Sequence, residues 1–451
     1  MKRLIALLLC AVICVGFLVA CKKDGGEPEE TTTAPAPEET PVEETVSPWD
    51  SFVATPNPTD VASGTFETLT ADYRSTGQYK KYCISSTRNS VRLDVLAPVF
   101  SIDGIIHPEQ NEGLYARFDK TTRDYFATNF PTAEIVLRET NTAGVTVRFR
   151  TNADAITLHA TVKNIQKGFP HLTGRGAYGF DVYVGTGSDR TYCGGKMQML
   201  VPTNLVPDDP TYPQFYTGTF ANPKNQSRIE LPEGYKEVMI EFPQYAGVEE
   251  LAIEFNTGTK IAPPLERMGG NICFYGSSIT QGACATRAGT SYTNIVSRMF
   301  DANCINLGFS SGAYGEQIVA EFIASRKEIT AFVMDYDHNT SEVRLGETHY
   351  PFYKTVREGL PDIPIVFVSR PIFTTEPTEE DLARLGHIKA TYERAIAEGD
   401  KNVYLVDGTK FFPDMNHDIY SIDMTHPNDI GFLHMAEAVY NALAPAMMKK
   451  D

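Results

Sequence analysis

The chain has 451 residues, of which 42% are hydrophobic, and its formal net charge at pH 7 is −17. This apolar content supplies buried cores, which excludes a chain that is disordered throughout, and the length predicts two or three domains. The negative charge excludes nucleic acid as the main partner, because phosphate recognition requires a basic surface.

Residues 1–20 read as an export signal rather than as part of the fold. Lys2 and Arg3 form a short basic start, and an almost uninterrupted apolar run follows over residues 4–19. The run is short for a membrane-spanning helix, which needs about 20 apolar residues. The sequence Leu-Val-Ala-Cys at 18–21 resembles the bacterial lipobox, and this resemblance implies that Cys21 carries a lipid. An ordinary signal peptide or a single spanning helix is the alternative.

Residues 21–47 predict a disordered acidic tether rich in Pro, Thr and Glu. Its residues 22–47 hold eight acids and two lysines with almost no apolar side chains. Such a segment buries too little apolar surface to offset the entropy lost on folding. We therefore expect an exported lipoprotein at the bacterial cell surface or in the periplasm, held to the membrane through its lipid.

Residues 48–262 predict an antiparallel β-sandwich of the jelly-roll kind. Apolar and polar residues alternate with a period of two in short segments that Gly, Pro, Asn and Asp separate, which is typical of such folds. The segments are 144–151, 155–164, 180–185, 236–243 and 250–258. No convincing long helical period is visible in this half.

Residues 263–451 predict a parallel sheet covered by helices. Short, mostly continuous apolar runs lie at 271–276, 303–308, 329–337, 363–370 and 402–408. Helical patterns follow at 291–300, 316–328, 350–360, 379–399 and 429–447. Strands that alternate with helices form a parallel sheet with right-handed crossovers, and its active site lies at the carboxyl ends of the strands.

Five cysteines remain beyond the signal and Cys21. Cys273 and Cys304 lie in apolar runs, and we expect them in the core. A bridge between Cys83 and Cys193 stays open, because spacing alone cannot establish it. The sequence has no CxxC motif and no cluster with zinc spacing, so we predict no metal site.

Two adjacent serines, Ser277 and Ser278, follow the first strand of the second half and precede a helix. A tight strand-to-helix turn presents a side chain at the sheet edge, where the helix N-terminus favours an anion. That setting suits a nucleophile that forms an acyl-enzyme. A serine that caps the helix is the alternative.

Near the end of the chain, Asp423 lies three residues before His426 in the segment SIDMTHPNDIGF. Pro427 restricts His426 to an extended conformation. A turn can then bring the carboxylate to one imidazole nitrogen and leave the other nitrogen free to accept a proton from a serine. The alternative is an acid near a helix start and a surface histidine.

Four segments, GSSIT, NLGFSSG, DYDHN and DMTHPND, together resemble the SGNH (GDSL-type) hydrolase superfamily over about residues 268–448. The resemblance implies a flavodoxin-like three-layer domain with a Ser-His-Asp triad. Ser278 would be the nucleophile, His426 the general base, and Asp423 the acid that orients it. Ser277 stands where the family usually has aspartate.

The same resemblance implies an oxyanion hole. Its donors would be the Ser278 N–H, a backbone N–H from the second segment, and the Asn339 side-chain amide. Ser311 occupies the usual glycine position and Gly312 follows it, so either could supply the second donor. Asp337 is a poor candidate for the third, since a carboxylate repels an oxyanion.

The segment GFDVYVG at 179–185 resembles the sandwich domain that precedes a bacterial branch of these hydrolases, over about residues 130–258. This implies that the sandwich packs near the catalytic edge. His171, Arg175, Tyr178 and Asp181 could line the substrate site, and ordinary turn and strand roles are the alternative. Glu316 could also face it, although a first-turn glutamate suits a helix start.

These observations predict a serine esterase that removes small acyl groups, acetyl in particular, from carbohydrate, without metal or organic cofactor. Its substrate would be an acylated small molecule or polysaccharide. A surface lipoprotein that binds glycan without catalysis is an alternative hypothesis. A lipase- or thioesterase-type acylhydrolase is another.

Overall fold

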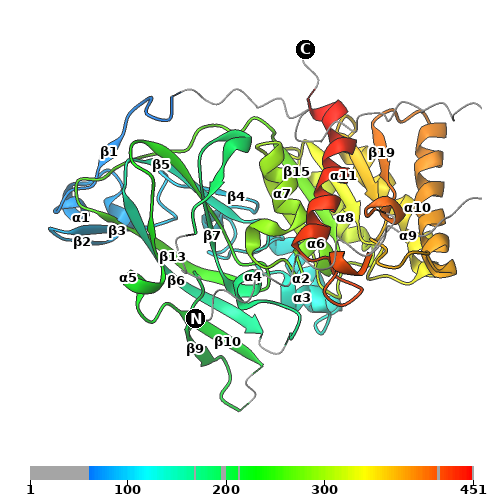
Figure 1. Cartoon of the computed structure of the whole chain (residues 1–451), viewed down its shortest axis with the longest axis horizontal. Helices are drawn as coiled ribbons and strands as arrows, with labels where there is room; N and C mark the ends of the chain where they lie inside the picture. The colour runs from blue at the N-terminus through cyan, green and yellow to red at the C-terminus, as the bar shows by residue number, and fades with distance from the viewer. Residues whose placement is uncertain (1–59, 167–168, 195–199, 212–213, 414–416, 449–451) are drawn as a thin grey trace, which may run out of the picture. The chain divides into compact units, whose positions relative to one another are not determined.

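The computed structural model describes residues 60–166, 169–194, 200–211, 214–413 and 417–448. Two antiparallel sheets, whose strands interleave along the chain, precede one parallel sheet, and all three belong to a single unit of the chain (Figure 1). The predicted signal, Cys21 and the tether lie outside the described residues. Within the described ranges, no helix combines the length and apolar character that crossing a membrane requires.

The first sheet has the strand order β1-β14-β5-β12-β7-β8, with β4 paired to β5, and every pairing is antiparallel. The strands are β1 Glu67–Thr68, β4 Ser101–Asp103, β5 Thr146–Thr151, β7 Asp181–Val184, β8 Thr191–Tyr192, β12 Lys236–Glu241 and β14 Lys260–Ala262.

The second sheet has the order β2-β3-β13-β6-β10-β9, with β11 paired to β6, again antiparallel throughout. Its strands are β2 Cys83–Ser86, β3 Ser90–Asp94, β6 Ala155–Gln166, β9 Asn204–Pro207, β10 Phe215–Thr219, β11 Arg228–Glu230 and β13 Gly247–Asn256.

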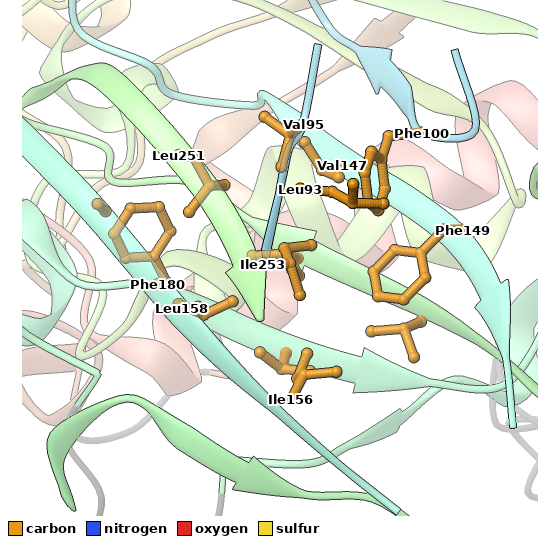
Figure 2. Close-up of a cluster of buried hydrophobic side chains, with 14 of the residues drawn as sticks. Leu93, Val95, Phe100, Val147, Phe149, Ile156, Leu158, Phe180, Leu251 and Ile253 are labelled. Atoms are coloured by element: carbon orange, nitrogen blue, oxygen red, sulfur yellow. The ribbon is translucent and has the colours of Figure 1, made fainter. Parts of the chain in front are cut away.

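The inward faces of these two sheets form one apolar core (Figure 2). Val147 and Phe149 of β5 belong to the same buried cluster as Leu158 of β6 and Ile253 of β13. Successive strand residues point to opposite faces, so alternating apolar residues reach one core. The predicted antiparallel sandwich is therefore confirmed.

The opposite face of the first sheet is also buried, because polar side chains there bind the second half of the chain. Arg190 is 9% exposed and pairs with Asp301 at 2.6 Å. Glu241 on β12 accepts from Arg298 at 2.6 Å. Buried charges need such partners, so these pairs hold the sandwich against the second half of the chain.

The parallel sheet has the order β16-β15-β17-β18-β19, which is the 2-1-3-4-5 order of flavodoxin-like folds. Its strands are β15 Asn271–Gly276, β16 Asn303–Gly308, β17 Ala331–Asp335, β18 Ile365–Val368 and β19 Val403–Val406. Helices α7 Tyr292–Met299 and α11 Asp429–Met447 cover one face, and α8 Gln317–Ser325, α9 Glu342–Gly359 and α10 Glu379–Ala397 cover the other (Figure 1). The three-layer prediction is confirmed.

Two helices differ from the sequence prediction. Helix α2, Lys120–Asn129, lies in residues 48–262, where the sequence shows no convincing helical period. The amphipathic period of α2 is weak, because only Thr122 and Phe126 among its residues are buried. Phe126 packs into the core of the parallel sheet. Helix α9 begins at Glu342, eight residues before the predicted start, because Ser341 caps it and Pro351 lies inside the helix.

The short helices are α1 Tyr73–Thr76, α3 Glu134–Arg138, α4 Gly174–Tyr178, α5 Pro223–Gln226 and α6 Ser278–Gln281. Cys83 and Cys193 are free thiols, so the bridge left open by their spacing is not formed. Cys273 and Cys304 are buried in the cores on either side of the parallel sheet, as expected.

Candidate active site

The turn between β15 and α6 presents Ser278 at the carboxyl edge of the parallel sheet. Ser277 caps the helix, because its Oγ accepts from the Ile279 N–H at 3.1 Å. Gly276 is required by packing, since a Cβ there would lie 2.3 Å from the Asp335 carbonyl oxygen. Capping is thus done by Ser277, which leaves the Ser278 hydroxyl for another partner.

The loop before α11 holds His426 and Asp423 together. Asp423 Oδ2 lies 2.8 Å from His426 Nδ1. Its Oδ1 accepts from the backbone N–H groups of His426 at 2.8 Å and Thr425 at 3.0 Å. A single β-bridge joins Ser421 to Pro427 and closes the loop. Three hydrogen bonds therefore fix the carboxylate against the imidazole.

The turn and the loop meet at one hydrogen bond, between Ser278 Oγ and His426 Nε2 at 2.9 Å. When Nδ1–H donates to Asp423, Nε2 carries the lone pair and accepts the Ser278 hydroxyl proton. Burial opposes ionisation of Asp423, but the hydrogen bonds from the His426 ring and backbone outweigh it and lower the pKa of this carboxyl. The geometry permits transfer of the serine proton to histidine.

The candidate hydrogen-bond donors to an oxyanion lie at the same carboxyl edge of the parallel sheet. The N–H groups of Ser278 and Ser311 have no acceptor among the described residues. The Gly312 N–H instead donates to the Phe309 carbonyl at 3.0 Å, so Ser311 is the better second donor. Asn339 Nδ2 donates one hydrogen to the same carbonyl at 2.9 Å, which leaves its second hydrogen for a ligand.

The backbone at Ser311 explains why glycine is usual there. Its φ is 53°, in the left-handed region that favours glycine. Gln281 of α6 fixes this turn, because its Oε1 accepts from the Ser310 N–H at 2.8 Å. No pattern in the sequence marks Gln281, since its partners lie far away along the chain.

Other polar residues near the third segment have structural partners. Asp337 is 2% exposed and accepts from the Arg370 N–H at 2.9 Å and from Arg384 at 3.3 Å. It therefore does not donate a hydrogen bond to an oxyanion. Burial and the nearby Arg370 lower the pKa of His338 to about 4, which keeps it neutral. His349 is 2% exposed and packs between Tyr336 and Phe367, away from Ser278.

Asp335 lies buried beneath the turn between β15 and α6. Its Oδ2 accepts from Thr280 Oγ1 at 2.8 Å and from the Tyr292 hydroxyl at 2.7 Å. Burial raises the pKa of this carboxyl to about 7, despite those two hydrogen bonds. Glu316 likewise has structural partners, because it accepts from the Tyr275 hydroxyl and the Tyr314 N–H at the start of α8.

Of the four sandwich candidates, His171 contacts His426. The His171 ring stacks on the His426 ring, with centroids 5.4 Å apart and planes 17° apart. Asp181 is fully buried and accepts from Arg175 at 3.0 Å, from Arg287 at 2.7 Å and from the Gly289 N–H at 2.9 Å. Asp181 therefore holds the segment that follows α6.

Tyr178 belongs to a small cluster between the two halves, which also contains Ala177, Tyr245, Ala283 and Cys284. Tyr245 donates its hydroxyl to the Ser278 carbonyl at 3.2 Å. Burial and the Asp423 charge raise the pKa of the Cys284 thiol to about 12, so this thiol does not compete as a nucleophile. Sequence reasoning missed Tyr245 and Cys284 as neighbours of Ser278, because no spacing rule links them to it.

Comparison with known proteins gives two family matches. Residues 270–444 match the model of the GDSL-like lipase/acylhydrolase family, and residues 93–261 match the GxDLY model, described as the N-terminus of SGNH hydrolase-type esterases. The letters GxDLY correspond here to residues 179–183, where Val182 stands in place of leucine. A comparison with curated proteins gives no match.

Solved structures share the fold. A protein described as a GDSL-like lipase from Bacteroides ovatus is 24% identical, with a TM-score of 0.64 over 80% of this chain and 99% of that one. The salicylyl-acyltransferase SsfX3 of a tetracycline biosynthetic pathway is 18% identical, with a TM-score of 0.60 over 79% and 97%. A family two carbohydrate esterase from Cellvibrio japonicus is 13% identical, with a TM-score of 0.48 over 80% and 98%.

Proposed function

From the match of residues 270–444 to the GDSL-like lipase/acylhydrolase family, which supports a carboxylic ester hydrolase, we propose that Ser278, His426 and Asp423 carry out the hydrolysis. The observation that carries the proposal is the continuous line of hydrogen bonds: 2.9 Å from Ser278 Oγ to His426 Nε2, then 2.8 Å from His426 Nδ1 to Asp423.

The reaction runs through an acyl-enzyme. Ser278 Oγ attacks the ester carbonyl while its proton passes to His426 Nε2. Asp423 stabilises the imidazolium, which then protonates the departing alcohol. Water attacks the acyl-serine with His426 again as base, and the acid leaves as Ser278 regains its proton.

The tetrahedral oxyanion is bound by the N–H groups of Ser278 and Ser311 and by the Asn339 amide. Two of these donors are unoccupied among the described residues, and the third keeps one hydrogen free. Each donor of this kind is typically worth about 3–4 kcal/mol in the transition state.

The substrate is a small acyl ester, acetyl in particular, on carbohydrate. The site lies near solvent, with the side chains of His426 and Asp423 15% and 33% exposed, whereas a long acyl chain would favour a buried apolar channel. His338, whose ring centroid lies 6.4 Å from that of His426, has a buried Nδ1 without a partner among the described residues.

The same proposal places the protein outside the cytoplasm, as a lipoprotein attached through Cys21. The apolar run at 4–19, the lipobox-like 18–21 and the acidic tether support it. A surface tether would bring the esterase to extracellular polysaccharide. Metabolic labelling with a fatty-acid analogue, lost in Cys21→Ser, would support the anchor; labelling that persists in this variant would contradict it.

The test of the substrate class is acetate release from a panel of acetylated oligosaccharides, together with p-nitrophenyl esters of increasing acyl length. We expect acetate release and a rate that falls with acyl length. A rate that rises with acyl length would favour a lipase- or thioesterase-type enzyme instead. Glycan binding without hydrolysis of any ester would favour the non-catalytic binding protein.

A further inference from the structure

Four side chains able to bind a metal ion meet beside Ser278. Their ligand atoms all lie within 4.8 Å of one another. They come from the sandwich, from the turn after α6 and from the loop before α11: His171, Cys284, Asp423 and His426. We refer to these four residues as the His–Cys cluster. Because they are far apart in sequence, no ligand spacing marks them.

The chemistry of the His–Cys cluster matches one class of cation. Two imidazoles, one thiol and one carboxylate are the ligand types that Zn²⁺ takes in tetrahedral sites, whereas Mg²⁺ and Ca²⁺ prefer oxygen alone. Zinc bonds of about 2.0–2.3 Å place tetrahedral ligands about 3.3–3.8 Å apart. Closing the 4.8 Å spread to that range needs shifts of about 1 Å, within reach of side-chain rotation at the partly exposed His171 and, once its bond to His426 Nδ1 is given up, at Asp423.

The cluster is open to solvent on one side and closed on the other. The side chains of Asp423 and His426 are 33% and 15% exposed, and Cys284 is 3% exposed. A cation would therefore enter past the carboxylate and reach the sulfur last. On coordination the Cys284 thiol loses its proton to solvent, since the thiolate is the ligand.

We propose that the His–Cys cluster binds Zn²⁺ and that the bound ion reversibly inhibits ester hydrolysis. If the metal takes His426 Nε2, it occupies the atom that lies 2.9 Å from Ser278 Oγ. If it takes Nδ1, the proton there moves to Nε2, which can then no longer accept one, and the 2.8 Å bond to Asp423 is broken. Either way the Ser278 proton has no base. The inhibitory part rests on the proposed function, and the binding part rests on the cluster alone.

Binding is measured without reference to activity. Zn²⁺ titration calorimetry of the full mature chain is carried out on the native protein, Ser278→Ala and Cys284→Ser, with Cys193→Ser as a control that removes a thiol elsewhere. We expect similar Kd values for native, Ser278→Ala and Cys193→Ser. Cys284→Ser should bind at least about 100-fold more weakly, since even outer-shell partners of metal ligands are worth 10–100-fold. Co²⁺ should give a thiolate charge-transfer band that Cys284→Ser lacks.

Inhibition is then measured as the ratio of each variant's rates with and without Zn²⁺. We expect a strong loss of p-nitrophenyl acetate hydrolysis in the native protein, reversal by a chelator, much weaker inhibition of Cys284→Ser, and no effect of Mg²⁺ or Ca²⁺. Equal Kd values for native and Cys284→Ser would overturn the proposed site. A native protein that binds Zn²⁺ through Cys284 but hydrolyses no ester would refute the proposed function and leave the metal site standing.

Discussion

Replacing Asp423 with asparagine tests how His426 is held, because it removes one charge and preserves the shape of the side chain. The amide oxygen can still accept from the N–H groups of His426 and Thr425, at 2.8 and 3.0 Å in the native loop. The amide nitrogen, however, takes the place of the oxygen that lies 2.8 Å from His426 Nδ1. Two donors cannot face each other, so the imidazole adopts the tautomer with its proton on Nε2.

That tautomer cannot accept the Ser278 proton. The same change in other Ser-His-Asp triads lowers kcat by about 10⁴, equivalent to about 5 kcal/mol of transition-state stabilisation. The Asp423 side chain is 33% exposed, so solvent weakens its field. We therefore expect kcat of Asp423→Asn to fall by about 10³ to 10⁴, with little change in KM.

Asp423→Ala is the matched comparison, because it also removes the acceptor of the two backbone N–H groups. We expect Asp423→Asn to lose less stability than Asp423→Ala, whose free energy of unfolding should fall by about 1–2 kcal/mol. Steady-state hydrolysis of p-nitrophenyl acetate and urea unfolding measure the two effects. An Asp423→Asn variant whose kcat stays within about tenfold of native would refute the idea that the carboxylate sets the tautomer.

Three further changes test other contacts. Asn339→Ala should lower kcat by about 10²–10³ with KM nearly unchanged, and an unchanged kcat would exclude it as an oxyanion donor. Asp181→Ala should lower the urea-measured unfolding free energy by about 3 kcal/mol, since it leaves Arg175 and Arg287 without their shared acid; a loss below about 1 kcal/mol would contradict this. Folding raises the pKa of the Asp335 carboxyl from 3.8 to about 7. Between pH 4 and pH 7 the native state therefore holds a proton on Asp335 that the unfolded state has lost, and the native state becomes less stable as pH rises through this range. Asp335→Asn should therefore gain stability relative to native by up to about 4 kcal/mol between pH 4 and pH 8, and a difference independent of pH would contradict the raised pKa.

The sequence predicts those elements whose signal is local. Strands β15 and β16 run over 271–276 and 303–308 as predicted, because buried parallel strands are continuous apolar runs bounded by turn residues. Helix α11 likewise matches residues 429–447. Helix α2 escapes prediction because only two of its residues are buried, so its amphipathic period is weak.

In the candidate site, too, the sequence predicts the residues that a local motif marks and misses those that only the packing of the chain brings together. Ser278, His426 and Asp423 are each marked by a local motif, and the structure brings them together, although their catalytic roles stay predictions. The choice between Ser311 and Gly312 depends on which N–H is already bonded, which a sequence does not encode locally. The positions of His171 and Cys284 beside His426 depend on how separate parts of the chain pack, so sequence spacing carries no trace of them.

The most direct test of the central claim is covalent labelling by a fluorophosphonate, read by intact mass and peptide mapping. The native protein should gain one adduct, on Ser278. Ser277→Ala, which loses only a helix cap worth about 1 kcal/mol, should label in the same way. Ser278→Ala should gain none. An adduct on Ser277, or labelling of Ser278→Ala to the native extent, would contradict the account.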